Sequence, residues 1–183
     1  ELFPANDWFA ARISGTPWIG ITGGCFGRVI AAESPRVNPG TSHRTEVLLH
    51  EITHAINLQQ TDRKLPMWLA EGLAVQEEHS AGGPMWPALL RRGIAVGDLL
   101  PVSNLNSGFT RAKNMAQRQL AYYQASLVVA ELKKRYGFDK VLALLAKFGQ
   151  GKKPAEAFQE VYNLDVAALD ALGMDAWKAA SKA

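Results

Sequence analysis

The 183-residue sequence contains a single cysteine, Cys25, which excludes an internal disulfide and any zinc site built from several cysteines. It also lacks an apolar run long enough for a membrane-spanning helix, and it has no recognisable signal peptide. Its 20 basic and 17 acidic side chains form no block of one sign. We therefore expect no transmembrane segment in this chain and no nucleic-acid partner.

Apolar residues make up 48% of the sequence, which is enough for one domain with a substantial core. We expect a single domain over residues 1–183, with a sheet-bearing part at about 1–79 and a helical part at about 80–183. Because the chain begins with Glu1 rather than Met, we expect a processed protein or an excised domain. An extracytoplasmic location, periplasmic or secreted, is favoured over a cytoplasmic one.

The most informative stretch is His50-Glu51-Ile52-Thr53-His54, an HExxH motif. On an α-helix, four residues advance by about 400°, so both imidazoles leave the same face one turn apart. This spacing allows two ring nitrogens to reach one Zn²⁺ ion. Glu51 then lies beside the metal, where it can act as general base towards a water molecule that the metal activates.

The residues around the motif predict a helix that is buried on most sides. Its apolar residues cover most of the circumference: Val47, Leu48, Leu49, Ile52, Ala55, Ile56 and Leu58. Uncompensated polar groups are costly in such a helix, which favours a metal site over a chance HExxH on a surface helix.

A catalytic zinc site needs a third protein ligand, and Glu71 is the strongest candidate. It lies in the middle of an apolar stretch, residues 65–75, which Pro66 can open as a helix. A carboxylate in such a place requires a partner. The alternative interpretation is an ion pair of Glu71 with Arg63 or Lys64.

With the stretch Trp68-Leu69-Ala70-Glu71-Gly72-Leu73-Ala74 after HExxH, the sequence resembles the gluzincin zinc peptidases, in particular peptidase MA-like domains and the catalytic domain of aminopeptidase N relatives. The resemblance implies one Zn²⁺ ion held by His50, His54 and Glu71. It also implies an α+β zincin-like fold. In that fold a small N-terminal mixed sheet lies over the HExxH helix, and the C-terminal half is mostly helical.

The same family carries a tyrosine on a later helix that ends at a glycine. The helical period of residues 116–136, followed by Gly137, resembles this helix and places the tyrosine at Tyr122. Its phenol would then donate a hydrogen bond to the oxyanion of the reaction. Tyr123 is the next choice, and a core aromatic hydrogen-bonded elsewhere is the alternative interpretation.

Residues 16–22 and 28–32 read as short strands around a hairpin turn at 23–27. The resemblance implies that a strand of this sheet runs along the cleft and binds substrate backbone by β-augmentation. Aminopeptidase N relatives have a G-x-M-E-N motif here, whose glutamate binds the substrate amine. The stretch Gly23-Gly24-Cys25-Phe26 contains no acid, which argues against an aminopeptidase and favours an endopeptidase.

Further helical segments are expected at 7–12, 89–92, 96–100, 138–148, 154–162 and 166–178. His43 and His79 lie outside the motif, and we interpret them as surface or second-shell histidines.

The sequence therefore predicts a zinc-dependent peptidase that acts on peptides or proteins with Glu51 as general base. Two alternatives stay open. One is a catalytically weak zincin-fold domain that serves as a binding or scaffold module. The other is a zinc hydrolase of a non-peptide amide or ester.

Overall fold

The computed structural model describes residues 1–15, 23–27, 29–34, 43–78 and 85–182. The fold is α+β and mostly helical, as predicted. The described strands are β1 (Leu2–Phe3), β2 (Gly23–Phe26) and β3 (Val29–Glu33). The described helices are α1 (Asn6–Ser14), α2 (His43–Thr61), α3 (Met67–Gln76), α4 (Trp86–Val96), the 3-10 helix η1 (Val102–Asn104), α5 (Ser107–Thr110), α6 (Met115–Tyr136), α7 (Phe138–Gly149), α8 (Pro154–Tyr162) and α9 (Val166–Ala180).

The described strands form one mixed sheet in the order β1-β3-β2. β1 runs parallel to β3, whereas β2 runs antiparallel to β3 with Gly23 opposite Ala32 and Phe26 opposite Val29. β2 is therefore an edge strand of this sheet.

The predicted hairpin turn at residues 23–27 is wrong, because residues 23–26 form β2 itself. The chain turns at Gly27, whose φ of 72° favours glycine. Gly23 is required for a different reason. A Cβ atom there would lie 2.6 Å from Val47 and 2.9 Å from Glu51, so its backbone approaches α2 more closely than other residues allow. The strand predicted at residues 16–22 lies outside the described residues.

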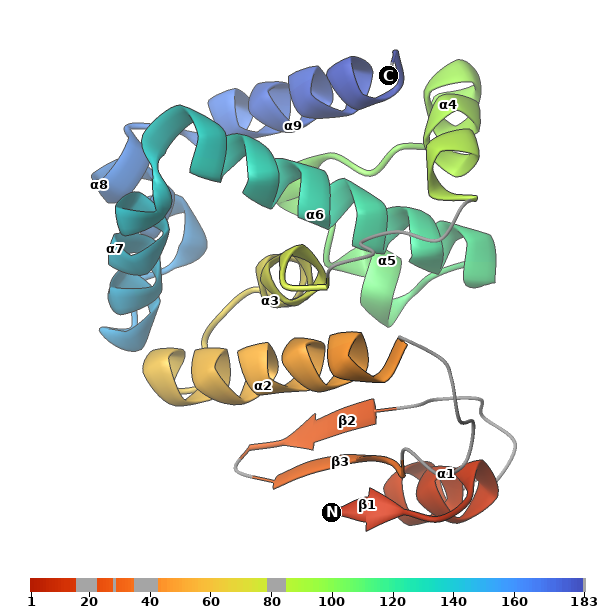
Figure 1. Cartoon of the computed structure of the whole chain (residues 1–183). Coiled ribbons are helices and arrows are strands. Elements are labelled where there is room, and N and C mark those ends of the chain that lie inside the picture. Colours follow the sequence, from red (N-terminus) through yellow and green to blue (C-terminus); the bar gives the residue numbers. More distant parts are fainter. Residues whose placement is uncertain (16–22, 28, 35–42, 79–84, 183) are drawn as a thin grey trace.

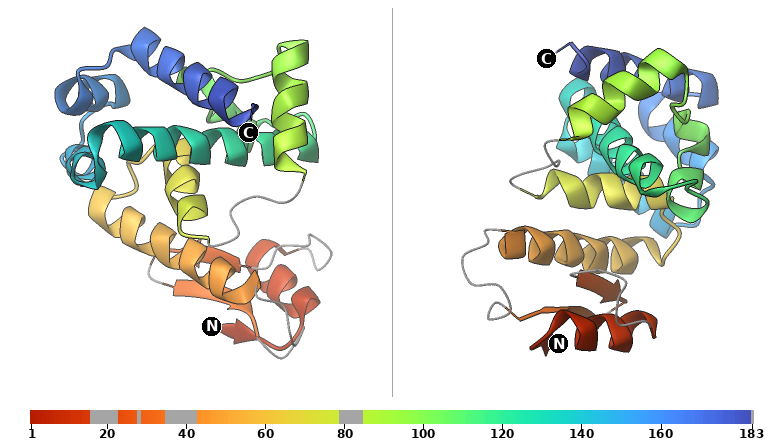
Figure 2. Two further views of the ribbon diagram at one scale, coloured as in Figure 1. Left: turned by 45° about the horizontal axis from the view of Figure 1, so that its top comes forward. Right: turned by 90° about the vertical axis from the view of Figure 1, so that its right-hand side faces the viewer.

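The elements stack in layers (Figure 1). The sheet lies against one side of α2, α3 lies against the other side of α2, and α6 then separates α3 from α9. A view from the side shows the same succession (Figure 2). α7 and α8 close one end of the stack and α4 lies at the other. This arrangement brings the HExxH helix between the sheet and the helical part of the chain.

Side-chain caps fix the starts of two of the long helices. The Asn114 side chain accepts a hydrogen bond from the Gln117 amide at the start of α6, at 2.9 Å. The Asp165 side chain accepts one from Ala168 at the start of α9, at 2.8 Å. Each cap satisfies an amide that the first turn of a helix leaves without a partner.

The main core lies around α3 and α6. Trp68, Leu69 and Leu73 of α3 are buried in it, together with the inner face of α6. Trp177 of α9 is fully buried and donates a hydrogen bond from Nε1 to the Gln124 carbonyl at 3.0 Å. Burial of these large side chains supplies the main driving force for packing the helical layers.

One face of α2 is exposed, which corrects the prediction of a helix buried on most sides. Leu48, Ile52 and Ile56 follow one another at intervals of four residues and are 45%, 37% and 49% exposed. The reason is geometric, because a helix between two layers makes contacts on two sides and leaves a third side open.

The helices predicted at 7–12, 116–136, 138–148, 154–162 and 166–178 are present with ends shifted by at most two residues. The segment predicted at 89–92 is the middle of the longer helix α4, and the helix predicted at 96–100 is absent. There α4 ends at Val96, because Gly97 adopts a left-handed conformation that terminates it. The structure does not describe the side chain of His43 or any part of His79. Within the described residues, no helix combines the length and the apolar character that crossing a membrane requires.

α3 and α6 approach each other closely at Gly72. A Cβ atom there would lie 2.7 Å from the Ala125 carbonyl oxygen and 2.8 Å from Val129. We predict that Gly72→Ala lowers the free energy of unfolding by about 1–2 kcal/mol, since overpacking outweighs the gain in helix propensity. Urea unfolding measures this difference. Lys134 on α6 is exposed, so the control variant Lys134→Ala should change the free energy of unfolding by less than about 0.5 kcal/mol. An equally small effect of Gly72→Ala would contradict the prediction.

Candidate metal centre

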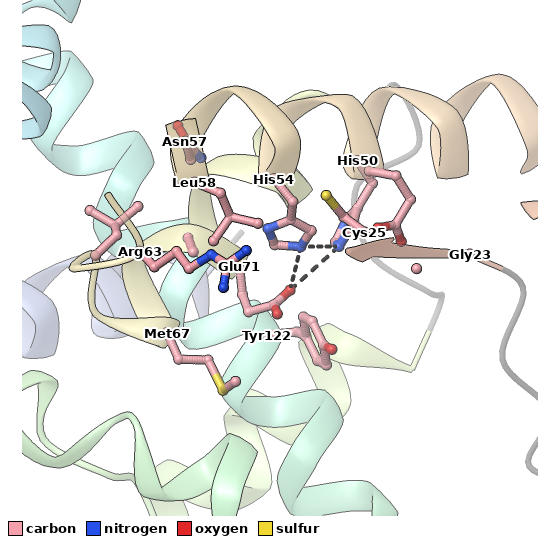
Figure 3. A pocket seen from close by; sticks show the side chains of 14 residues that line it. Gly23, Cys25, His50, His54, Asn57, Leu58, Arg63, Met67, Glu71 and Tyr122 are labelled. Atoms are coloured by element: carbon pink, nitrogen blue, oxygen red, sulfur yellow. Dashed lines mark hydrogen bonds and ion pairs between the residues drawn. The ribbon is translucent and has the colours of Figure 1, made fainter. Parts of the chain in front are cut away.

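Three side chains from two helices converge at one point (Figure 3). His50 and His54 project from the same face of α2, and their Nε2 atoms are 3.0 Å apart. Glu71 approaches from α3, with its Oε2 atom 3.4 Å from His50 Nε2 and 3.3 Å from His54 Nε2. The sequence predicted these three residues as ligands of one metal ion, and the fold brings their side chains together.

The spacing and chemistry of these atoms fit Zn²⁺. Tetrahedral zinc with ligands at about 2.0–2.1 Å requires neighbouring donor atoms to be roughly 3.3 Å apart, close to the separations observed. Two imidazole nitrogens and one carboxylate oxygen are also ligands that zinc accepts. Moreover, Glu71 Oε2 is buried and accepts no hydrogen bond from any described residue. A cation at this point would satisfy that oxygen.

His50 is fixed by a second carboxylate. Its Nδ1 atom lies 2.6 Å from Glu78 Oε1, and Glu78 is the second residue beyond the end of α3. In a neutral imidazole, the proton on Nδ1 donates to Glu78 and leaves a lone pair on Nε2, which faces Glu71 and His54. A carboxylate in this position orients an imidazole and raises its strength as a metal ligand.

The charges of these groups favour positive charge at the centre. Burial opposes ionisation of His50, but Glu71 and Glu78 outweigh it and raise the pKa of the imidazole to about 9. Burial likewise opposes ionisation of Glu71, but His50 and His54 lower the pKa of its carboxyl to about 2. Glu71 is therefore a carboxylate throughout the neutral range, and the site stabilises a proton or a metal cation.

Glu51 lies next to the imidazoles and is 7% exposed. Burial raises the pKa of its carboxyl, His50 and His54 partly counteract this, and the charges of Glu71 and Glu78 raise it further. A carboxylate with a raised pKa is a stronger base, which suits a group that accepts and passes on a proton.

Tyr122 lines the same cavity as the three converging side chains, whereas Tyr123 is not among the cavity-lining residues. The Tyr122 ring packs edge-on against Phe109, with centroids 5.0 Å apart, and Tyr123 packs against Trp86. Burial and the negative charge of Glu71 raise the pKa of the Tyr122 phenol, so that the hydroxyl keeps its proton and can donate it in a hydrogen bond.

The cavity has a volume of about 400 Å³ and lies between β2, α2 and α3. Gly23, Gly24 and Cys25 form the wall on the side of the sheet. Burial and the nearby Glu51 raise the pKa of the Cys25 thiol, so it stays neutral. The wall is thus an edge strand with small side chains, alongside the converging imidazoles.

The described residues do not support an ion pair of Glu71 with Arg63 or Lys64. Glu71 faces the two imidazoles instead, and Lys64 forms an ion pair with Asp62, with Nζ and Oδ2 3.0 Å apart. The sequence interpretation missed Glu78. A weak signal existed, because Glu78 follows Glu71 by seven residues, a spacing that would return to the same face of a longer helix, although α3 ends at Gln76.

Comparison with known proteins agrees with this geometry. A family model described as the peptidase MA superfamily matches residues 29–183, which include every converging side chain described above. No curated protein and no solved structure gives a significant match. The matched region covers most of the sequence, and its assignment supports a metallopeptidase-like function with peptides or proteins as substrates. The chain therefore belongs to the peptidase MA superfamily.

Proposed function

We propose that the protein is a zinc-dependent peptidase, with an endopeptidase favoured over an exopeptidase. His50, His54 and Glu71 would hold the zinc ion. The observation that carries the proposal is the meeting of two imidazole nitrogens and one otherwise unpartnered carboxylate oxygen within 3.4 Å of one another. Zn²⁺, when bound, supplies a Lewis acid that polarises a scissile carbonyl and makes a water molecule more acidic.

Glu51 is the general base. Its carboxylate lies beside the imidazoles and against the backbone of β2, where the substrate and the attacking water must meet. It takes the proton of the attacking water and then passes it to the nitrogen of the leaving amine. Its raised pKa makes the carboxylate a stronger base for the first of these transfers.

Tyr122 stabilises the negative charge that develops on the carbonyl oxygen. Its phenol stays protonated and lines the same cavity as Glu71, so it can donate a hydrogen bond to that oxygen. Tyr123 contacts Trp86 and is the weaker candidate for this role.

The substrate main chain pairs with β2. As the edge strand, β2 has main-chain groups that do not pair with β3, and Gly23, Gly24 and Cys25 line the cavity. The stretch carries no carboxylate that could bind a free amino terminus, which supports cleavage within a chain rather than removal of amino-terminal residues.

Hydrolysis of a library of unstructured peptides tests this proposal. We expect the zinc-loaded protein to cleave peptides and a chelator to stop cleavage. Glu51→Gln should retain the metal but lose nearly all hydrolysis, because the amide cannot accept the proton. Mass spectrometry identifies the products, and elemental analysis measures the bound zinc.

Each contrary result has a distinct meaning. Wild-type turnover in Glu51→Gln would show that another group is the base. Tight zinc binding without cleavage of any peptide would instead indicate a binding or scaffold domain. Cleavage of non-peptide amides or esters alone would indicate a different hydrolase.

A second prediction concerns the oxyanion. Tyr122→Phe should lower kcat by about 10²–10³, as expected for the loss of one oxyanion donor, with little change in zinc content. Tyr123→Phe is the matched control and should keep the wild-type kcat. If the two variants exchanged these outcomes, the role would belong to Tyr123.

A third prediction concerns the support of His50. Glu78→Gln should weaken zinc affinity by about 10- to 100-fold, because the amide no longer accepts a charge-assisted hydrogen bond from Nδ1. Competition with a fluorescent chelator measures the affinity without reference to activity. The neighbouring Glu77 faces Lys133 rather than the imidazoles, so Glu77→Gln serves as the control. Equal affinities of the two variants would remove Glu78 from the site.

A further inference from the structure

One cation in the cavity has no function in the proposed chemistry. Arg63 belongs to the connection between α2 and α3, and it lines the cavity that holds His54 and Glu71. Among the described residues, no carboxylate forms an ion pair with its guanidinium, whereas the adjacent Lys64 has Asp62 as a partner at 3.0 Å. In Figure 3 the Arg63 side chain points into the cavity. A guanidinium placed in this way is free to bind a ligand.

The backbone holds Arg63 in an unusual conformation. Asp62 and Arg63 follow one another with φ values of 49° and 60°, in the left-handed region that L side chains disfavour. Two hydrogen bonds fix this turn, from the Arg63 amide to the Leu58 carbonyl at 3.2 Å and from the Lys64 amide to the Thr61 carbonyl at 3.0 Å. Such conformations are concentrated at functional sites, where they aim a side chain.

Two neighbours shape the same end of the cavity. A Cβ atom at Gly27 would lie 3.0 Å from an Arg63 Nη atom, so the chain at Gly27 lies close against the guanidinium. Asn57 also lines the cavity, is 5% exposed, and has an amide nitrogen without an acceptor among the described residues.

The charges along the cavity are therefore divided. Glu51 lies beside Gly23 and the imidazoles, whereas Arg63 lies beside Gly27, and both side chains line the cavity. β2 leads from one end to the other, since Gly23 lies against Glu51 and Gly27, just beyond the strand, lies against Arg63. A peptide paired with β2 would thus have one of its groups beside Arg63.

We propose that Arg63 binds a carboxylate of the peptide substrate close to the scissile bond. The planar guanidinium matches a carboxylate with two parallel hydrogen bonds, which makes it the side chain best suited to this task. The carboxylate comes either from an Asp or Glu side chain or from the carboxyl terminus of the substrate. This inference rests on the proposed peptidase function and names its substrate class.

The test uses a set of quenched fluorescent peptides that share one cleavable core. Asp, Asn or Lys is placed in turn at each position around the scissile bond, and each peptide is made with a free or an amidated carboxyl terminus. The wild-type protein should cleave the best peptide with a carboxylate about 10- to 100-fold better in kcat/KM than the same peptide with that carboxylate replaced by an amide, as expected for a charge-assisted hydrogen bond. The replacement is Asn for Asp in the side-chain series and an amidated terminus in the terminal series. A preference that persists in amidated peptides identifies a side chain, and one that depends on the free terminus identifies the terminal carboxylate.

Arg63→Asn should reduce this ratio to about one, and asparagine tolerates the left-handed backbone at this position. Arg63→Glu should invert the preference towards the Lys peptides. Lys64→Asn removes the same charge at the next residue and should leave the wild-type ratio unchanged. A wild-type ratio near one, or an equal ratio in wild type and Arg63→Asn, would overturn the inference even though cleavage itself continues.

A binding measurement separates this inference from the proposed function. Zinc-loaded Glu51→Gln should bind the best acidic peptide about 10- to 100-fold more tightly than its amide counterpart by calorimetry, and adding Arg63→Asn should abolish the difference. This difference supports the carboxylate subsite even if the wild-type protein cleaves no peptide. Its absence refutes the subsite whatever the activity.

Discussion

The structure depends on how closely α3 lies between α2 and α6. α2 supplies two imidazoles on one face, but the third converging group, Glu71, comes from α3. The packing of α3 against α6 fixes the position of Glu71, since the next residue, Gly72, lies close against the backbone of α6 at Ala125. A larger residue there would push α3 towards α2 and move the carboxylate. Packing in the hydrophobic core therefore fixes a distance between polar groups on its edge, as rigid interiors do elsewhere.

The electrostatic design of the cavity follows from the same layers. Glu71 lies on α3 and Glu78 lies just beyond its end, and both contact His50, one at each ring nitrogen. The imidazole is thus held between two carboxylates, which makes the point between α2 and α3 a strong attractor of positive charge. The negative charges of Glu71 and Glu78 oppose ionisation of Glu51 and so help to raise the pKa of its carboxyl.

Features that are local in sequence could be predicted, and features that need tertiary contacts could not. The HExxH spacing fixes the relative positions of His50 and His54 on any helix, and the apolar stretch around Glu71 indicated a buried carboxylate. In contrast, Gly23 and Gly24 look like part of a turn, since the close approach of α2 to Gly23 is invisible in the sequence. Arg63 was considered only as a partner of Glu71, because neither its left-handed backbone nor the cavity can be read from residue types.

The ligand set has a consequence for assembly. The converging groups and the carboxylate behind His50 all lie between residues 50 and 78, whereas Tyr122 and β2 reach the cavity from distant parts of the chain. Contacts of short sequence separation form at a lower entropic cost and therefore earlier than distant ones. With the metal ligands proposed above, the α2–α3 hairpin would bind an ion before the cavity is complete. Metal binding and peptide cleavage would then depend on different stages of folding, and metal binding alone would not show that the cavity is complete.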